Sequence, residues 1–238
     1  GLGDVYKRQE QKLIENVCTA FHQKGKKVTV ILNTCGVLET SSWKEQPDAI
    51  LVSWLAGQEG GNAVADILTG TVTPSGKLPM TWPVNYEDVP SASNFPLAGR
   101  KESIDSTRYE EGLFVGYRYY DTFDKPVSYP FGYGLSYTTF DYGNLNIEKK
   151  EDVVEISCRI INSGNRAGKE VVQVYVSFPE KNENYPTKEL KGFAKVHLLP
   201  GEEKTVSMEI SARNLSYYEE RLGDWYAPSG TYRILIGH

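Results

Sequence analysis

The sequence is poor in the residues that build metal sites and disulfide frameworks. It has three cysteines and three histidines among 238 residues, and none of them lie at the close spacing that zinc ligands require. No structural metal is therefore predicted, and no motif indicates a cofactor. Each cysteine lies in an apolar neighbourhood, which predicts small buried core residues rather than bridges. These are Cys18, Cys35 and Cys158.

Long hydrophobic runs and an excess of basic residues are also absent. No apolar run approaches the ~20 residues that cross a bilayer. The net charge of −5 is spread along the chain, which argues against nucleic-acid and membrane partners. The sequence has no G-x-S-x-G, so a hydrolase built on a nucleophile elbow is disfavoured.

The chain does not begin with methionine, and residues 1–9 (GLGDVYKRQ) match neither the helix predicted after them nor the rest of the pattern. We interpret them as a non-native remnant and leave them out of the fold. With no native start to interpret, a cytoplasmic and a secreted location both remain open.

Residues 10–83 predict part of an α/β domain. A helix with an apolar face (Leu13, Ile14, Val17, Cys18, Phe21) precedes a strand at 28–32, and a second strand at 48–55 precedes a helix ending near Leu68. This order predicts parallel strands covered by helices. Two strands are fewer than such a sheet usually has, so these residues are expected to form the C-terminal part of an α/β sandwich domain.

The pattern changes twice along the rest of the chain. Residues 84–139 contain scattered prolines and many aromatic residues, which predicts a connection that packs against a domain rather than a flexible linker. Residues 140–238 alternate apolar and polar positions, as at 154–160 and 172–178. Residues 194–210 are expected to form a hairpin around Leu199–Glu203. Together these strands predict an immunoglobulin-like or fibronectin type III β-sandwich.

Four segments carry a resemblance to a known family. The first, GQEGGNAVADILTGTVTPSGKLPMTWP, spans Gly57 to Pro83. The second and third follow at 109–121 and 129–140, and the fourth consists of 189–193 together with 199–202. The whole set resembles glycoside hydrolase family three, the β-glucosidase and β-xylosidase group. The resemblance covers roughly residues 11–237.

The resemblance implies a retaining β-glycosidase, most simply a β-glucosidase, that acts on a β-linked oligosaccharide or an aryl glycoside. In that family an aspartate nucleophile belongs to an N-terminal barrel of the same polypeptide. The acid/base glutamate lies in a loop upstream of the helix that begins near Glu10. Neither carboxylate matches a position of this sequence. No catalytic residue is therefore assigned, and the chain is expected to be inactive alone.

The carboxylates that are present have simpler interpretations. Glu59 precedes a predicted helix, where an anion is stabilised and caps the helix, and this suits a general acid poorly. Glu110 and Glu111 are neighbours in an extended segment and point to opposite sides. An ion pair with Arg108 or Arg118 is expected for them. Asp66 is expected on a solvated helix face, and His197 on the outer face of the sandwich.

Several aromatic residues could stack on a sugar, although core or interdomain packing is the more frequent use of such side chains. Trp43 is the best candidate for a sugar contact, because it follows a strand end, where parallel sheets bind ligands. The same rule makes 33–36 and 55–58 the expected rim of a cleft. The other aromatic residues considered are Trp54, Trp82, Trp225, Tyr117, Tyr119 and Tyr120.

Two functions remain compatible with the sequence. The chain is either the C-terminal part of a β-glycosidase or a non-catalytic module that binds carbohydrate or serves as structure. Two parallel strands with unpaired edges would be unstable and adhesive alone. This favours the first function.

Overall fold

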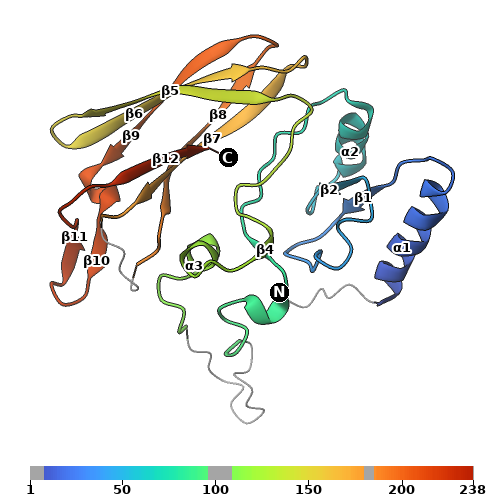
Figure 1. Cartoon of the computed structure of the whole chain (residues 1–238), viewed down its shortest axis with the longest axis horizontal. Helices are drawn as coiled ribbons and strands as arrows, with labels where there is room; N and C mark the ends of the chain where they lie inside the picture. Colours follow the sequence, from blue (N-terminus) through green and yellow to red (C-terminus); the bar gives the residue numbers. More distant parts are fainter. Residues whose placement is uncertain (1–7, 96–108, 180–184, 238) are drawn as a thin grey trace. The chain divides into compact units, whose positions relative to one another are not determined.

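The computed structural model describes residues 8–95, 109–179 and 185–237, and the chain folds into two compact units (Figure 1). One unit consists of 1–72, 80–112 and 125–131, and the other of 73–79, 113–124 and 132–238. The chain therefore passes between the units several times. The domain limits expected from the sequence, 10–83, 84–139 and 140–238, stay a prediction.

The first unit contains the expected α/β elements. Helix α1 (Arg8–His22) leads to strand β1 (Thr29–Leu32), and strand β2 (Ala49–Val52) leads to helix α2 (Gly60–Thr69). The two strands pair in parallel, with Thr29 opposite Ala49 and Leu32 opposite Val52. Strand β2 is shorter than the predicted 48–55, and α1 begins at Arg8, so Arg8 and Gln9 are helical. Residues 1–7 lie outside the described residues, and their interpretation as a remnant stays a prediction.

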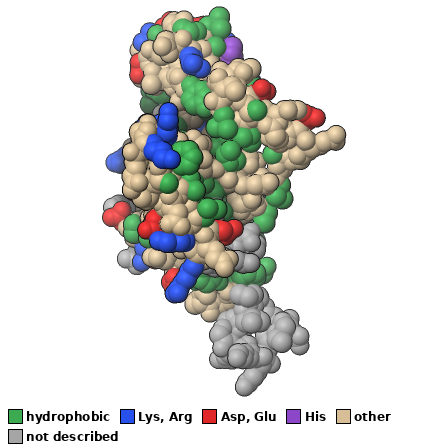
Figure 2. All heavy atoms as spheres, turned by 90° about the vertical axis from the view of Figure 1, so that its right-hand side faces the viewer, with side chains coloured by type: hydrophobic (Ala, Val, Ile, Leu, Met, Phe, Trp, Pro, Cys, Tyr) green, Lys and Arg blue, Asp and Glu red, His purple; other side chains and the backbone are tan. Residues whose placement is uncertain are grey.

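The apolar face of α1 is only partly covered. Cys18 is buried, as expected, but Leu13 and Phe21 are 62% and 50% exposed. In α2 no residue is buried, and Leu68 is 49% exposed. Figure 2 shows hydrophobic side chains at the surface of the face that carries α1 and α2. A sheet of two strands is too narrow to cover an amphipathic helix fully, because each strand adds only about 5 Å of width.

A cluster around Asp48 joins the end of α1 to the start of β2. The Asp48 carboxylate is 2.6 Å from Lys27 Nζ and 2.9 Å from His22 Nε2, and it accepts a 2.8 Å hydrogen bond from the Val28 amide. These donors hold the pKa of Asp48 well below its usual range, Lys27 having the largest effect. The carboxylate thus fixes the helix to the sheet by electrostatic and hydrogen-bond contacts at the surface.

Part of the expected connection also belongs to the first unit. Strands β3 (Trp82–Pro83) and β4 (Val127–Tyr129) pair antiparallel, and a short 3₁₀ helix spans Tyr86–Asp88. Ser128 of β4 shares a 2.7 Å hydrogen bond with the buried Thr40 hydroxyl, and its carbonyl accepts from Lys44 Nζ at 2.9 Å. The segment is therefore packed, as its aromatic content predicts.

The second unit is the predicted β-sandwich, made of two three-stranded antiparallel sheets. One sheet has the order β5-β6-β9 and the other β12-β7-β8 (Figure 1). The strands are β5 (Phe140–Lys149), β6 (Val153–Asn162), β7 (Gly168–Ser177), β8 (Glu189–Leu198), β9 (Glu203–Ser211) and β12 (Arg233–Gly237). A small pair, β10 (Tyr217–Glu219) and β11 (Asp224–Tyr226), follows the 3₁₀ helix Ala212–Leu215. Helix α3 (Tyr117–Thr122) also belongs to this unit.

The alternation seen in the sequence sets the core of the sandwich. In β6, Ile156, Cys158 and Ile160 are buried, and in β7 the same holds for Val172, Val174 and Val176. These side chains form two adjoining clusters with residues of β8 and β9. The polar face of β7 is not exposed to solvent along its whole length, however. Gln173 is 3% exposed, which the period of two does not predict.

The expected hairpin around Leu199–Glu203 is wrong. Strand β8 pairs with β7 and strand β9 pairs with β6, so the turn crosses from one sheet to the other. Two apolar strands separated by a turn look the same in sequence whether they pair with each other or arch between sheets. The distinction depends on the partners that each strand finds in the fold.

Asn162, at the end of β6, holds this arch in place. Its backbone amide donates to the Glu202 carbonyl at 3.0 Å, and its carbonyl accepts from the Gly201 amide at 2.9 Å. Its side-chain amide donates to the carbonyls of Leu198 and Arg166, and its side-chain oxygen accepts from the Thr138 hydroxyl and the Gly164 amide. The side chain is fully buried, and all its hydrogen-bonding groups are used.

Candidate functional site

The carboxyl ends of β1 and β2 form the candidate site in the first unit, where parallel sheets usually present ligand-binding loops. In the loop after β1, the buried Thr34 hydroxyl donates to the Gly36 carbonyl at 3.0 Å and accepts from the Gly36 amide at 3.3 Å. The loop is thus closed on itself. Cys35 between them is exposed, so its expected place in the core is wrong, whereas Cys18 and Cys158 are buried as predicted.

Trp54, directly after β2, has an unusual backbone. Its φ is +52°, a left-handed conformation that is rare for a bulky residue and costs about 1–3 kcal/mol. Its ring meets that of buried Trp82 edge to face at 6.2 Å, and Trp82 meets Tyr129 in the same way at 6.1 Å. Packing of three aromatic rings therefore holds the strained residue. No pattern in the sequence signals this conformation.

Trp43 lies in the core of the first unit. Its side chain is 2% exposed, and its indole Nε1 donates to the Glu39 carbonyl at 2.9 Å. A ring face must be open to stack on a sugar, so this burial supports packing, the more frequent use of such a side chain. A sugar contact by Trp43 stays a prediction.

Glu59 occupies the N-cap position of α2 but does not cap it. The Glu59 side chain accepts no hydrogen bond from a backbone amide of the first turn, and its carboxylate instead accepts from the Asn62 side chain at 2.6 Å. The expected capping contact is therefore wrong, because the side chain of Asn62, the third residue of the helix, is the donor that the carboxylate meets. Asp66 is exposed on the same helix, as predicted.

Glu110 and Glu111 do not pair with Arg118. Arg118 Nε lies 3.0 Å from Glu189 Oε1 of strand β8, and Arg108 is outside the described residues. Glu110 is exposed and Glu111 is half-buried. The ion pair expected from neighbouring sequence is replaced by one across 71 positions, because α3 lies beside the start of β8 in the second unit.

The aromatic residues of α3 are used in packing. The Tyr117 hydroxyl accepts from the Leu190 amide at 2.8 Å, and its ring meets Tyr175 edge to face at 5.9 Å. Tyr120 is buried, and Tyr119 packs on Tyr120 and Phe123. This confirms the packing use expected for these three tyrosines.

Trp225 and His197 lie on the surface of the second unit. Trp225 is 47% exposed, and its ring packs at the surface against the Arg213 guanidinium at 4.4 Å and the Tyr218 ring at 6.1 Å rather than in the core. His197 is exposed on β8, as the alternation predicts. Within the described ranges no group of three or more His, Cys, Asp or Glu is arranged to hold a metal ion. Across the same ranges, no helix is long and apolar enough to cross a membrane.

The fold is a parallel α/β segment followed by a fibronectin-like β-sandwich. Residues 4–117 match the family described as glycosyl hydrolase family 3 C-terminal domain, and residues 170–238 match the fibronectin type III-like domain. The chain belongs to glycoside hydrolase family 3 and corresponds to the C-terminal part of its members.

Curated relatives agree with this assignment. A β-glucosidase of Kluyveromyces marxianus is 44% identical over 211 residues, which are 88% of this chain and 24% of the relative. The thermostable β-glucosidase B of Acetivibrio thermocellus is 44% identical over 214 residues, 88% of this chain and 27% of the relative. An exo-α-(1→6)-L-arabinopyranosidase of Bifidobacterium longum is 40% identical over 226 residues, 94% of this chain and 29% of the relative.

A solved structure gives the same result. The β-glucosidase 3B of Thermotoga neapolitana in complex with glucose has a TM-score of 0.91 and 45% sequence identity, and the match covers 98% of this chain and 32% of that one. The chain thus spans about a quarter to a third of the length of these relatives.

Proposed function

We propose that the chain is the C-terminal part of a retaining β-glycosidase that removes terminal β-linked glucose from an oligosaccharide or an aryl glycoside. The observation that supports this most strongly is the 44% identity to β-glucosidases across 88% of the chain. The relatives are between three and four times as long as this chain, so the proposed activity requires sequence that this chain does not contain. In this proposal the partner is the N-terminal barrel of the same polypeptide.

In this proposal the chain supplies supporting structure for the enzyme, and the carboxylates that cleave the glycosidic bond belong to the rest of the polypeptide. A retaining glycosidase needs two carboxyl groups about 5–5.5 Å apart on either side of the bond. Glu59 is bound to Asn62, and Asp66 and Glu110 are exposed to solvent. None of these three side chains is buried, whereas a catalytic pair is enclosed around the bond that it cleaves. We therefore expect the isolated chain to be inactive.

A hybrid enzyme tests this proposal directly. The C-terminal segment of the Acetivibrio thermocellus β-glucosidase B that matches this chain would be replaced by the chain itself. We expect the hybrid to release 4-nitrophenol from 4-nitrophenyl β-D-glucoside. The isolated chain and the shortened Acetivibrio protein are the controls, and both should be inactive. Turnover by the isolated chain that is abolished by Glu59→Gln would overturn the assignment of catalysis to the rest of the protein.

The sugar specificity of the proposed enzyme is tested with the same hybrid. Because relatives named as arabinopyranosidases are 40–41% identical over 94% of the chain, 4-nitrophenyl α-L-arabinopyranoside is the competing substrate. We expect the β-D-glucoside to have the higher kcat/KM. Parallel comparison with the intact Acetivibrio enzyme separates the influence of this chain from that of the barrel.

The rim of β1 and β2 is the proposed contribution of the chain to the substrate cleft. Two observations support this proposal: the Asn33–Gly36 and Leu55–Gln58 loops follow parallel strands, and the strained Trp54 directly precedes the second loop. Trp43 would reach a sugar only if its surroundings opened. In the hybrid, Trp43→Phe is therefore expected to leave KM unchanged, and a rise in KM with constant kcat would favour the sugar contact.

The alternative function is a non-catalytic module that binds carbohydrate or serves as structure. Calorimetric titration of the isolated chain with cello- and xylo-oligosaccharides distinguishes the two. We expect no heat of binding at millimolar oligosaccharide. Micromolar affinity would favour the binding module instead.

A further inference from the structure

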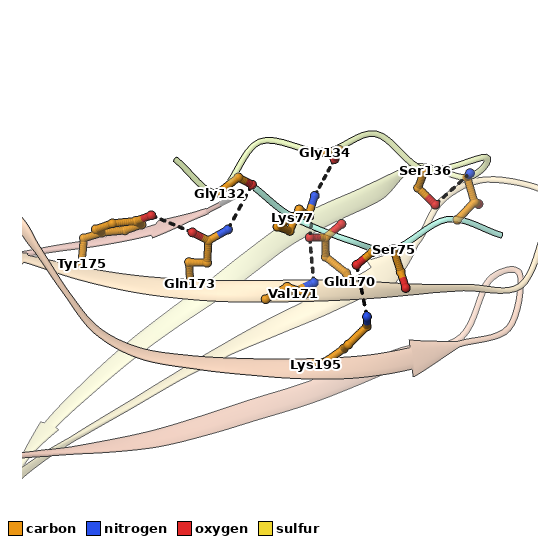
Figure 3. Close-up of polar contacts among 11 residues, drawn as sticks. Ser75, Lys77, Gly132, Gly134, Ser136, Glu170, Val171, Gln173, Tyr175 and Lys195 are labelled. Atoms are coloured by element: carbon orange, nitrogen blue, oxygen red, sulfur yellow. Dashed lines mark hydrogen bonds and ion pairs between the residues drawn. The ribbon is translucent and has the colours of Figure 1, made fainter. Parts of the chain in front are cut away.

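A buried ion pair lies within the second unit. Lys77 Nζ is 3.2 Å from Glu170 Oε1, with side chains 10% and 3% exposed. Lys77 also donates to the Gly134 carbonyl at 2.8 Å. Figure 3 shows the Lys77 side chain between the Gly134 segment and strand β7, where Glu170 lies. We name these three residues the charge lock.

Glu170 lies in the part of β7 that has a strand partner on one side only. Strand β12 pairs with β7 only from Gln173 to Ser177, so residues 168–172 have β8 alone as a neighbour. The Val171 amide donates to Glu170 Oε1 at 2.8 Å. The carboxylate therefore occupies a backbone donor that an edge strand would otherwise leave open to pairing.

The Glu170 side chain points toward the core of the sandwich. Glu170 shares the alternation of Val172, Val174 and Val176, which are all buried. Burial raises the pKa of the nearby Tyr142 hydroxyl, and the negative charge of Glu170 raises that pKa further. Lys77 lies beside this carboxylate, and its positive charge offsets part of the cost of burying a negative one.

Two chain segments meet at this edge and pair with each other. The Leu78 amide donates to the Tyr133 carbonyl and the Gly132 amide donates to the Leu78 carbonyl, both at 2.8 Å. At Gly134 a Cβ atom would lie 2.2 Å from the Gly76 carbonyl oxygen, so the backbones approach as closely as only glycine permits. The alignment of the two segments is therefore tight at this point.

Further polar contacts fix the same segments to β7 and β8. The Gln173 amide donates to the Gly132 carbonyl at 3.4 Å, and the Tyr175 hydroxyl donates to the Gln173 side-chain oxygen at 2.6 Å. Lys195 Nζ donates to the Ser75 carbonyl at 3.2 Å from the surface. The Gly132 segment covers Gln173, which explains why this polar side chain of β7 is not exposed to solvent (Figure 3).

We propose that the charge lock sets the register of segments 73–79 and 132–136 on the sandwich, and that this, rather than net stabilisation, is its role. Removing two charges from water costs about as much as their attraction returns, so a buried pair is often replaceable by apolar residues without loss of stability. A charge pair differs from apolar contact in tolerating only one alignment. A shift of segment 73–79 by one residue would move Lys77 away from the buried Glu170 carboxylate. A shift of segment 132–136 would move the Gly134 carbonyl away from Lys77.

Amide hydrogen exchange of the full chain tests the proposal. In Lys77→Met the unpaired anion remains, and we expect exchange in peptides covering 73–79 and 130–136 to accelerate about a hundredfold or more. In the double variant Lys77→Met/Glu170→Leu we expect the urea midpoint of the sandwich to return to that of the parent protein. Exchange at the Leu78 and Gly132 amides should nevertheless remain fast, because the two segments have lost their fixed alignment.

The matched control is Lys195→Met, the same substitution at an exposed donor to the same segment. Its exchange rates should stay within about twofold of the parent. Parental slow exchange in the double variant would show that packing and glycine contacts alone set the register, and it would overturn the proposal. The same conclusion follows if Lys77→Met exchanges as slowly as Lys195→Met. If Lys77→Met does not fold, the double variant decides by itself.

Discussion

At the scale of single residues, the sequence and the structure differ most where one polar side chain serves several partners. Asn162 is an ordinary residue at the end of a strand in the sequence, with turn residues after it. In the fold it connects both ends of the arch between β8 and β9 with the entry to β5. Such a role cannot be foreseen, because its partners lie up to 40 positions away, at Glu202.

Replacing this asparagine should be costly. Asn162→Ala removes the side-chain partner of buried groups of Thr138 and Leu198 and of part-buried groups of Gly164 and Arg166, so we expect a loss of about 3 kcal/mol in the free energy of unfolding. Urea unfolding followed by circular dichroism measures it. Asn146→Ala, at an exposed position of β5, should change the value by less than about 0.5 kcal/mol. Equal effects of the two variants would contradict this role of Asn162.

A second residue-scale prediction concerns pH. The donors around Asp48 lower the pKa of its carboxyl group, so Asp48 contributes stability that is present above the ordinary aspartate pKa of about 3.9. That contribution is lost as the pH falls through the lower pKa of the folded state. Asp48→Asn should therefore destabilise the first unit at pH 7.

The pH profile provides the critical comparison for this prediction. As the pH falls below about 4, the difference in melting temperature between Asp48→Asn and the parent should shrink progressively, because the unfolded parent binds the proton before the folded parent does. Asp66→Asn, at an exposed position of α2, serves as the control and should run parallel to the parent. A constant difference between Asp48→Asn and the parent from pH 7 to pH 2 would refute the prediction.

At the scale of elements, the position of a strand in its sheet decides what an apolar residue contributes. Ile147 of β5 and Ile156 of β6 face each other in the register, yet Ile147 is 49% exposed and Ile156 is 1% exposed. Strand β5 is at the edge of the sheet and β6 is central. The same residue type thus has different surroundings on neighbouring strands.

This pair gives a matched prediction. Ile156→Ala should cost about 3–4 kcal/mol, because it removes a core side chain and leaves a cavity. Ile147→Ala should cost about 1 kcal/mol or less, since half of the side chain is already in water. Urea unfolding of both variants measures the difference. Similar costs would show that the edge strand is covered in solution.

The alternation of apolar residues predicted the individual strands better than their connections. Strands β6 and β7 and their buried residues were predicted from a period of two, because side chains of a strand alternate between faces. The arch between β8 and β9 was predicted as a hairpin, since local sequence does not record which strand becomes the hydrogen-bond partner. Helix α2 was likewise predicted, whereas the missing cap at Glu59 depended on the competing donor Asn62.

At the scale of the whole molecule, the chain offers separate reporters for its two units. Trp43, Trp54 and Trp82 belong to the first unit, and Trp225 belongs to the second. The first unit has a sheet of two strands, and the second has two three-stranded sheets around a continuous apolar core. The sandwich therefore has more buried apolar surface to stabilise it.

We expect two transitions in urea. In the variant Trp225→Phe, fluorescence reports only the first unit, and its midpoint should lie below that of the β-sheet signal in circular dichroism. Trp43→Phe, which leaves a reporter in each unit, is the control and should show both transitions in fluorescence. Coincident midpoints by both methods in Trp225→Phe would show that the units unfold together.

The sequence by itself determined the family, the two kinds of secondary structure and the faces that the strands bury. These features depend on local periodicity and on long motifs, both of which are contained in the order of neighbouring residues. Tertiary structure alone decided that Trp54 takes a left-handed conformation, that Arg118 pairs with Glu189, and that Lys77 reaches Glu170. Each of these depends on contacts between residues far apart in the chain, and such contacts are set by packing rather than by neighbours in sequence.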